Sequence, residues 1–382
     1  MAFDGGGEVE LHYHHENDTA TSLRRDLLAC LDLYNRHGLL LECGAPPRRN
    51  FGFVHGDWTL DNARNGWKCG VNGELSLLKE LGCWADFTMP SADASQTRKI
   101  NSIYYALDDP SRCKSHDVGI DAQAGVADRA GFLLMQGPLG INWRAPSHPR
   151  IENANLTSDN WGRLDRVRKW IDCNVHVKGR PDWLFVKLHT HGAIERDFDA
   201  LFGDKAFAMH RMLNELYNDG HRYRLHYATA RQAYNLVKAA EAGKDGDPRA
   251  WQDYAVGPPA TSLYALDTLH KATVCATDLL QIEAVAGSAA TLLRTRVGDV
   301  REIRGALASV RIDAATGVVD LSSEAPKAEL TLRFAAPLDL VECDAQGARL
   351  SRGPQQDEWH VQLSEAGRAS LRSRVQHPAL VS

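Results

Sequence analysis

The stretch GEVELHYHHENDT, residues 7–19, places a strand-like segment ahead of a turn and a helix. Its residues alternate between apolar and polar, so His12 and His14 project from the same face of the strand. His15 follows directly, at the expected strand end. Imidazoles grouped in this way are well placed to hold zinc or a similar divalent ion, so we expect His12, His14 and His15 to be metal ligands. The alternative is a solvated edge strand whose polar residues line its wet face.

The chain around this stretch alternates strand-like and helix-like segments. Short apolar runs bounded by turn residues predict strands at residues 8–14, 51–55, 84–89, 132–136, 183–189 and 223–229. Amphipathic patterns predict a helix capped by Asp18, with Leu23, Leu27 and Leu31 on its apolar face, and helices at residues 74–81, 160–172, 205–218 and 229–242. This alternation is typical of an α/β fold, and we expect a distorted or incomplete (β/α) barrel over residues 1–257.

The last third of the chain has a different texture. Residues 242–262 have the composition of a linker, and the segments beyond them, such as LLQIEAVAG, GVVDLSS and EWHVQLSEAG, alternate with a period of two between glycine-rich turns. Such a pattern predicts a small all-β, sandwich-like domain over residues 258–382.

A second pair of histidines ends an apolar run. The segment DWLFVKLHTHG, residues 182–192, finishes in His189 and His191. Because barrel enzymes carry their chemistry at the carboxyl ends of strands, we expect both histidines to be catalytic, together with Asp57 from FVHGDWTLDN. The structural alternative is a pair of imidazoles bonded to backbone carbonyls.

Further polar side chains lie where expected strands or loops end. Several such segments in succession are not required by structure alone, so we expect their side chains to bind substrate. Trp58 would suit stacking on a sugar, although burial in the core is an equally good reading. The candidate substrate-binding residues are His55, Trp58, Asp86, His116 and Arg144.

Composition excludes several classes of partner. The 382 residues carry a net charge of −5, which disfavours a nucleic-acid or anionic membrane surface. No apolar run approaches the roughly 20 residues of a membrane span, and no secretory signal is evident at the N-terminus. The eight cysteines are scattered without a C-x-x-C pair, which favours reduced thiols and a cytoplasmic location.

Taken in order, EVELHYHH, FGFVHGDWTLDN, GCWADFTMPSA, KSHDVG and FVKLHTHGA resemble a divergent polysaccharide deacetylase (carbohydrate esterase family 4, NodB homology) of the kind encoded with exopolysaccharide assembly. The resemblance implies a barrel that binds one divalent metal through an aspartate and two histidines and removes acetyl groups from a polysaccharide. It also implies an aspartate that takes a proton from water, and a late-strand histidine, His189 or His191, that protonates the leaving group.

This chain departs from the family pattern in two ways. The family pairs its metal histidines four residues apart, whereas position 16 here is Glu16, so His12 and His14 are the best substitutes. Family members also have an aspartate-rich strand and a helix ahead of these histidines, and Asp4 is too close to His12 to leave room for them. We therefore expect the first strands to be missing, and the general base and third ligand with them.

Two other functions fit parts of the sequence. VELHYH also resembles the H-x-H strand of amidohydrolase barrels, which would need further strand-end histidines such as His116, His191 and His226. A barrel without a complete ligand set would instead be a non-catalytic carbohydrate-binding module.

Overall fold

The computed structural model describes residues 7–36, 39–43, 48–127, 129–145, 148–192 and 194–256, and beyond these only strand segments between residues 261 and 373. Asp4 lies outside the described residues. The chain divides into two compact units, one formed by residues 10–25 and 52–255 and the other by residues 1–9, 26–51 and 256–382. The boundary expected between residues 257 and 258 stays a prediction.

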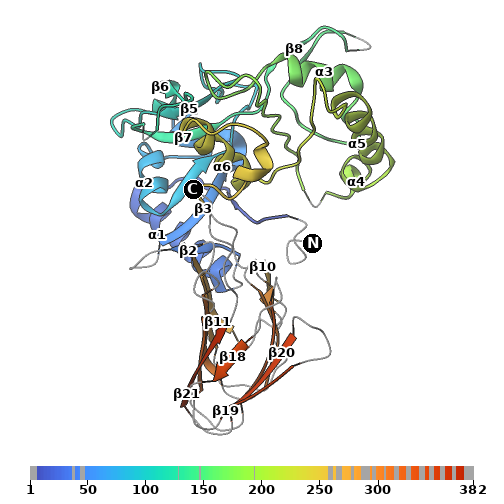
Figure 1. The fold of residues 1–382 in the computed structure, drawn as a ribbon. Coiled ribbons are helices and arrows are strands. Elements are labelled where there is room, and N and C mark those ends of the chain that lie inside the picture. The colour runs from blue at the N-terminus through green and yellow to red at the C-terminus, as the bar shows by residue number, and fades with distance from the viewer. Residues whose placement is uncertain are drawn as a thin grey trace. The chain divides into compact units, whose positions relative to one another are not determined.

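The helices and strands of the first 256 residues follow one another along the chain as Figure 1 labels them. The helices are α1 (Ala20–Arg36), α2 (Glu74–Glu80), α3 (Leu164–Asp172), α4 (Phe198–Phe202), α5 (Asp204–Tyr217) and α6 (Ala230–Glu241). The strands are β1 (Leu11–Tyr13), β2 (Leu41–Cys43), β3 (Arg48–His55), β4 (Cys83–Asp86), β5 (Ile103–Ala106), β6 (Gly119–Asp121), β7 (Phe132–Met135), β8 (Gly140–Asn142) and β9 (Arg150–Glu152).

A mixed sheet organises this part of the chain, and the fold is mixed α/β. Its strands run in the order β1-β3-β4-β7-β5-β6, with β2 paired beside β3. The pairs β1–β3 and β4–β7 are parallel, whereas β5 is antiparallel to both β6 and β7. Within the described residues this path begins at β1 and ends at β6 without closing on itself.

Two segments that the sequence predicts as strands are not strands, and those predictions are wrong. Residues 183–189 form no ladder: Phe185 donates its backbone N–H to Val175 at 2.8 Å, and His189 forms an isolated bridge with Asn155. Residues 223–229 form no hydrogen-bonded pair with another strand either. Both runs are apolar enough for strands, but their backbone groups bond to loops rather than to a neighbouring strand.

Helix α1 begins as the sequence pattern requires, but with a different cap. Thr19 and Ser22 bond reciprocally: the Ser22 N–H donates to Thr19 Oγ1 at 3.1 Å and the Thr19 N–H to Ser22 Oγ at 2.9 Å. Thr19 is therefore the N-cap, and the prediction of Asp18 is wrong. The predicted apolar face is confirmed, because Leu23, Leu27 and Leu31 are fully buried.

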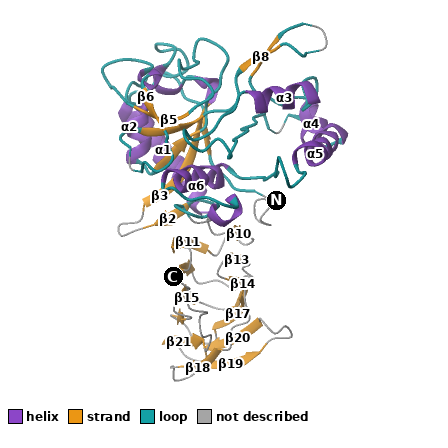
Figure 2. Cartoon of the chain, turned by 45° about the horizontal axis from the view of Figure 1, so that its top comes forward, coloured by secondary structure: helices purple, strands orange, loops and turns teal. Residues whose placement is uncertain are grey.

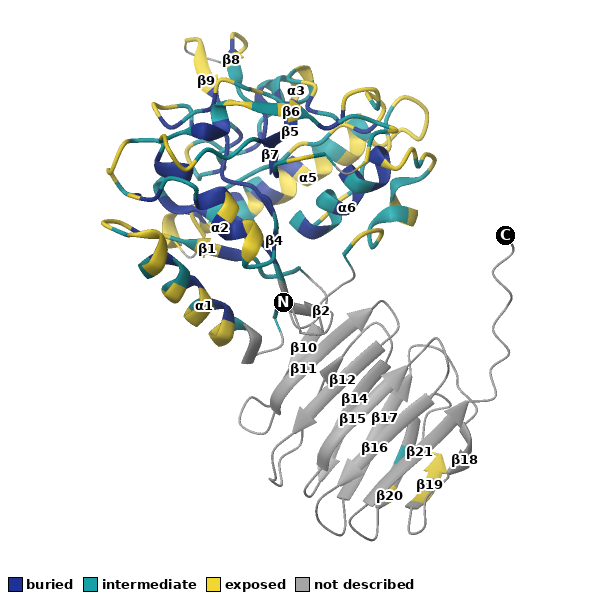
Figure 3. Cartoon of the chain, turned by 90° about the vertical axis from the view of Figure 1, so that its left-hand side faces the viewer, coloured by how far each residue is buried: buried dark blue, intermediate teal, exposed yellow. Residues whose placement is uncertain are grey.

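The other helices pack their apolar faces on two cores. Helix α6 begins with a capping box between Thr229 and Gln232 and buries Leu236 and Val237 against the sheet. A second core joins α3 and α5 through Trp170 and Met209, and these helices lie side by side in Figures 1 and 2. Figure 3 shows how burial concentrates along β4, β5 and β7. In the described parts of the chain, no helix has both the length and the apolar character needed to cross a bilayer.

Beyond residue 260 the described residues are all in strands. These are β10 (Thr261–Leu263), β11 (Leu269–Ala276), β12 (Leu279–Ala284), β13 (Leu293–Arg294), β14 (Gly298–Arg304), β15 (Leu307–Asp313), β16 (Val318–Ser323), β17 (Ala328–Phe334), β18 (Leu340–Cys343), β19 (Ala348–Arg352), β20 (Glu358–Leu363) and β21 (Gly367–Ser373). They form two six-stranded sheets, in the orders β10-β13-β14-β17-β20-β19 and β11-β12-β15-β16-β21-β18.

Candidate functional site

The histidine-rich segments meet at one edge of the mixed sheet. Strands β1 and β3 are parallel, and their register pairs Tyr13 with His55. His14 and His15 therefore leave β1 at the same level at which His55 ends β3. In open α/β sheets, ligands bind outside the carboxyl ends of the strands, and this edge is such a place.

Three of the predicted residues, His12, His14 and Asp57, form what we call the outer cluster. The Nε2 atoms of His12 and His14 face each other at 2.9 Å. His12 Nδ1 lies 3.1 Å from the Val54 carbonyl oxygen, and His14 Nδ1 lies 3.1 Å from Asp57 Oδ2. Because a carbonyl and a carboxylate can only accept, both Nδ1 atoms carry a proton, and when both rings are neutral both Nε2 atoms present lone pairs.

Two facing lone pairs call for a positive charge between them. Burial, with the neighbouring His14, lowers the pKa of His12, which keeps that ring neutral at neutral pH. Two nitrogen ligands of a tetrahedral zinc ion lie roughly 3.3 Å apart, so this pair, at 2.9 Å, would open slightly to take the ion. A metal-binding histidine also ordinarily donates its other N–H to a carboxylate or a carbonyl, as His12 and His14 do here. The outer cluster has the chemistry of a metal-binding pair.

The other predicted catalytic histidines lie beside this pair. His191 is close enough to His12 for its charge to lower the pKa of His12. The Trp58 ring meets His189 and His191 edge to face, with centroid separations of 6.1 and 6.0 Å. Burial, reinforced by the charge of Lys187, lowers the pKa of His189 to about 3, so His189 is neutral at neutral pH.

The loop that carries Asp57 and Trp58 has an unusual backbone. Asp57 has φ of 56° and Trp58 has φ of 58°, both in the left-handed region. Aspartate tolerates this region, but for a bulky residue such as tryptophan it is a genuine outlier. Strained residues of this kind cluster at active sites and ligand clamps, where the surrounding structure holds them in place.

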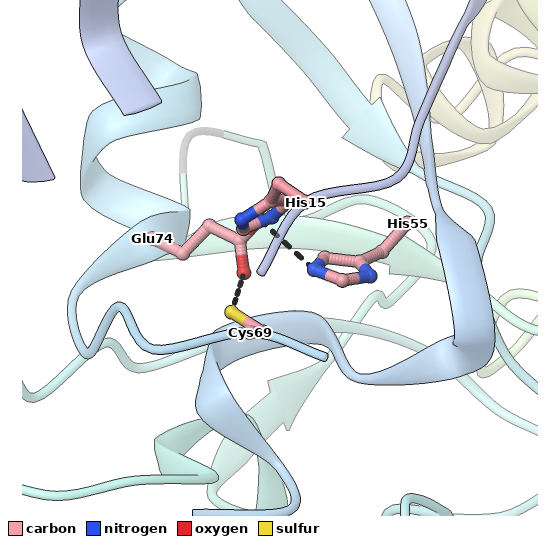
Figure 4. A group of neighbouring side chains, drawn as sticks. All are labelled: His15, His55, Cys69 and Glu74. Carbon is pink, nitrogen blue, oxygen red and sulfur yellow. Dashed lines mark hydrogen bonds and ion pairs between the residues drawn. The ribbon is translucent and has the colours of Figure 1, made fainter. Parts of the chain in front are cut away.

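A second group, which we call the inner cluster, consists of His15, His55, Cys69 and Glu74. One ligand atom from each lies within 4.8 Å of all the others, and the group could hold a metal ion. The exposed fractions of these residues are 8%, 2%, 0% and 0%, respectively. Figure 4 shows the four side chains pointing toward one another from separate segments of the chain.

The inner cluster is organised around one buried carboxylate. Burial alone would raise the pKa of Glu74, but His55 and His15 hold it below its usual value. Burial would lower the pKa of His15, yet Glu74 and Asp18 raise it. Burial lowers the pKa of His55 and raises that of the Cys69 thiol well above its usual value. Glu74 is therefore a charged acceptor around which the other three groups are arranged.

The remaining predicted residues are members of neither cluster. Asp86 is buried and accepts hydrogen bonds from the backbone and hydroxyl of Thr88, and burial raises its pKa to about 6. His116 is fully buried, with Nδ1 at 3.6 Å from Asp61. Arg144 is exposed and forms an ion pair with Asp172 on α3 at 2.7 Å. Their roles in substrate binding stay predictions.

The structure thus groups the predicted residues differently from the sequence. His12, His14, Asp57, His191 and Trp58 lie together, whereas His15 and His55 turn into the interior. Sequence reasoning did not identify Cys69 and Glu74 as members of a site. The sequence pattern places Glu74 at the start of a helix and Cys69 among several scattered thiols. No spacing pattern connects either residue to His15.

Comparisons with protein-family models, with curated proteins and with solved structures found no match to this chain.

Proposed function

We propose that this protein is a metal-dependent hydrolase that removes acetyl groups from a carbohydrate, with the outer cluster as its catalytic centre. The single observation that carries the proposal is the pair of Nε2 atoms of His12 and His14, which face each other at 2.9 Å. Both histidines are exposed, so a third side of the ion would be open to water and substrate. Such an open position distinguishes a catalytic metal site from a structural one.

A zinc ion held by this pair would supply Lewis-acid polarisation of the acyl oxygen. Asp57 accepts a hydrogen bond from His14 Nδ1–H and so fixes the tautomer that leaves Nε2 free. The Val54 carbonyl does the same for His12. These two contacts hold the ligand atoms in place before substrate arrives, which lowers the cost of organising the site.

His191 is the better of the two candidate acids. An acid that protonates the leaving amine or alkoxide must hold a proton near neutral pH. The lowered pKa of His189, about 3, excludes that residue from the role, whereas His191 is exposed beside Trp58. We assign proton donation to His191 and the positioning of Trp58 to His189.

A carbohydrate is the substrate class that the surroundings favour. The indole of Trp58 is partly exposed next to His191, and an aromatic face is a common platform for a sugar ring. The resemblance to polysaccharide deacetylases supports the same substrate class. The proposal includes the finer fold expected with it, an incomplete barrel followed by a sandwich-like all-β domain.

The amidohydrolase alternative is weaker for a structural reason. It needs strand-end histidines such as His116 and His226, but His116 is fully buried beside Asp61, and His226 lies in the 223–229 segment that forms no strand. A non-catalytic carbohydrate-binding module would retain Trp58 without needing a metal.

The test compares a His12→Ala/His14→Ala double variant with His176→Ala, which alters a partly exposed histidine whose Nδ1 bonds to the Asn174 carbonyl. We expect the double variant to release no acetate from acetylated oligosaccharides and to hold less zinc, while His176→Ala matches the original protein in both. Equal acetate release from the double variant and the original protein would contradict the proposal. Sugar binding without any acetate release would favour the binding-module alternative.

A further inference from the structure

The inner cluster is built differently from the outer one and has no place in the proposed chemistry. It draws His15 from the end of β1, His55 from the end of β3, Cys69 from a loop and Glu74 from the first turn of α2. We propose that these four side chains form a closed, structural zinc centre, separate from the outer cluster. The catalytic proposal requires only His12 and His14, so either site can be disproved without affecting the other.

The separations between Glu74 and the other three residues of the inner cluster are close to those in a tetrahedral ligand shell. Glu74 Oε1 lies 3.1 Å from His15 Nε2 and 3.6 Å from His55 Nε2, and Glu74 Oε2 lies 3.5 Å from Cys69 Sγ. Zinc bonds of about 2.0–2.3 Å at tetrahedral angles put neighbouring nitrogen, oxygen and sulfur ligands roughly 3.3–3.7 Å apart. The three separations from Glu74 are near this range, and the four ligand atoms all lie within 4.8 Å of one another, so the group could close around one small ion.

An unpartnered nitrogen points into the cluster and is an independent sign of a ligand. Among the described residues, His55 Nε2 has no hydrogen-bond partner although the side chain is fully buried. The Nδ1 atom of the same ring donates to the Gly56 carbonyl, so Nε2 presents a lone pair toward the Glu74 carboxylate. A lone pair buried against a carboxylate is unfavourable by itself, and a cation between them removes the conflict.

The outer contacts of both histidines match those of metal ligands. His15 Nδ1 donates to Asp18 at 2.5 Å, and His55 Nδ1 donates to a backbone carbonyl. Each ring is thus held from behind by an acceptor, with Nε2 directed at the centre. This is the usual second layer of a zinc–histidine site, and it explains why Asp18 is turned toward His15 instead of capping α1.

Charge and proton balance also favour a divalent ion. On binding, the Cys69 S–H bond breaks, its proton passes to solvent, and sulfur bonds to the ion; any proton on His15 Nε2 leaves in the same way. The thiolate and the Glu74 carboxylate then carry two negative charges against the two positive charges of zinc. A buried centre with no net charge avoids the large cost of isolated buried ions.

The structural role follows from the burial of the ligands. All four coordination positions are filled by protein, and the most exposed of the four residues is His15, at 8%. No position remains for water or substrate, in contrast to a catalytic site. The ion would tie the ends of β1 and β3 to the start of α2, segments up to 59 residues apart in the sequence.

Sulfur ligation is the property that identifies this centre, because the outer cluster offers none. The protein purified with Zn²⁺ would be studied by metal analysis and zinc-edge X-ray absorption. We expect a sulfur scatterer at about 2.3 Å from zinc in the unaltered protein. A spectrum with nitrogen and oxygen ligands alone, or no bound zinc, overturns the inference without any variant being needed.

Variants then assign the sulfur. Cys69→Ser should abolish the sulfur signal and release one zinc per chain, while Cys83→Ser, which alters another buried thiol, should keep both. The His12→Ala/His14→Ala double variant should also keep the sulfur-ligated zinc, even if it loses all activity. An unchanged sulfur signal in Cys69→Ser overturns the inference, whereas the absence of a second, outer zinc from the unaltered protein overturns only the catalytic proposal.

Discussion

The outer and inner clusters are both built on a pair of histidines, and adjacent residues of the chain belong to different clusters. His14 is exposed and faces His12, while His15, the next residue, is buried against Glu74. Both residues follow the end of β1, and a single step along the chain separates water from the interior. The comparison teaches that burial, and not residue type, decides which histidines are available for chemistry.

The two clusters also differ in how their charges are balanced. In the outer cluster Asp57 touches His14 from behind, and its side chain remains about one-third exposed. In the inner cluster the Glu74 carboxylate lies at the centre and has no contact with water. Changes to the inner cluster should therefore affect stability, and changes to the outer cluster should affect metal affinity and catalysis.

The largest effect is expected for Glu74→Gln. The carboxylate accepts from the Asp61 backbone N–H at 2.7 Å and neutralises the buried His15, so removing its charge should cost about 3–5 kcal/mol of unfolding free energy. Urea denaturation measures this loss. The control is Glu80→Gln on the same helix, whose exposed pair with Arg24 should matter by less than about 1 kcal/mol. Equal urea midpoints for the two variants would show that the buried carboxylate contributes no more to stability than the exposed one.

Asp57→Asn tests the outer cluster. Asparagine also tolerates the left-handed backbone at this position, so the change removes the charge behind His14 without new strain. We expect zinc affinity to fall about 10–100-fold, or about 1.4–2.7 kcal/mol, with little change in stability. Titration with a competing chelator measures the zinc affinity. The control is Asp93→Asn, which alters an exposed ion pair with Arg64. Unchanged zinc affinity in Asp57→Asn would show that His14 needs no orienting carboxylate.

The lowered pKa of His189 predicts that the free energy of unfolding depends on pH. Its folded-state pKa is lowered to about 3 by burial and by Lys187, His191 and Arg166, against about 6.5 in the unfolded chain. As the pH falls below 6.5, the unfolded chain gains a proton that the folded chain refuses. Between pH 7 and pH 5 this should cost about 2 kcal/mol.

The measurement is the unfolding free energy at both pH values in the original protein and in His189→Gln. The His189→Gln variant should lose this part of the pH dependence, and His176→Gln, at a partly exposed position, should retain it. The same pH slope in all three proteins would mean that His189 is as solvated as His176.

The smallest effect is expected for Trp58→Ala. Loss of the indole beside His191 should raise KM for an acetylated oligosaccharide about fivefold, or about 1 kcal/mol, and leave kcat nearly unchanged. Trp143→Ala is the matched control, because Trp143 is 72% exposed and lies on the turn after β8. Steady-state kinetics of the original protein and the two variants measures these KM values. Equal KM values in all three would show that Trp58 does not contact the substrate.

Local features of the fold could be predicted because they depend on residues close in sequence. The apolar spacing of Leu23, Leu27 and Leu31 gave the buried face of α1, and alternation put His12 and His14 on one side of β1. The strand expected at residues 183–189 failed because apolar character does not guarantee a hydrogen-bonding neighbour. A closed barrel is not observed among the described residues for the same reason: strand pairing depends on distant partners.

The inner cluster could not be predicted from the sequence because its residues come from distant segments. His15 and Glu74 are 59 positions apart, and nothing in their local patterns links them. Asp18 has the composition of a helix cap, but Thr19 takes that role and leaves the Asp18 carboxylate for His15. A site assembled from a strand end, a loop and a helix start becomes visible only when the chain is folded.

The most direct test of the account is anomalous X-ray scattering at the zinc edge from crystals grown with Zn²⁺. We predict a peak about 2.1 Å from both His12 Nε2 and His14 Nε2, open on one side to solvent. A map with no peak between these two nitrogens would contradict the central claim that the outer cluster is a metal centre.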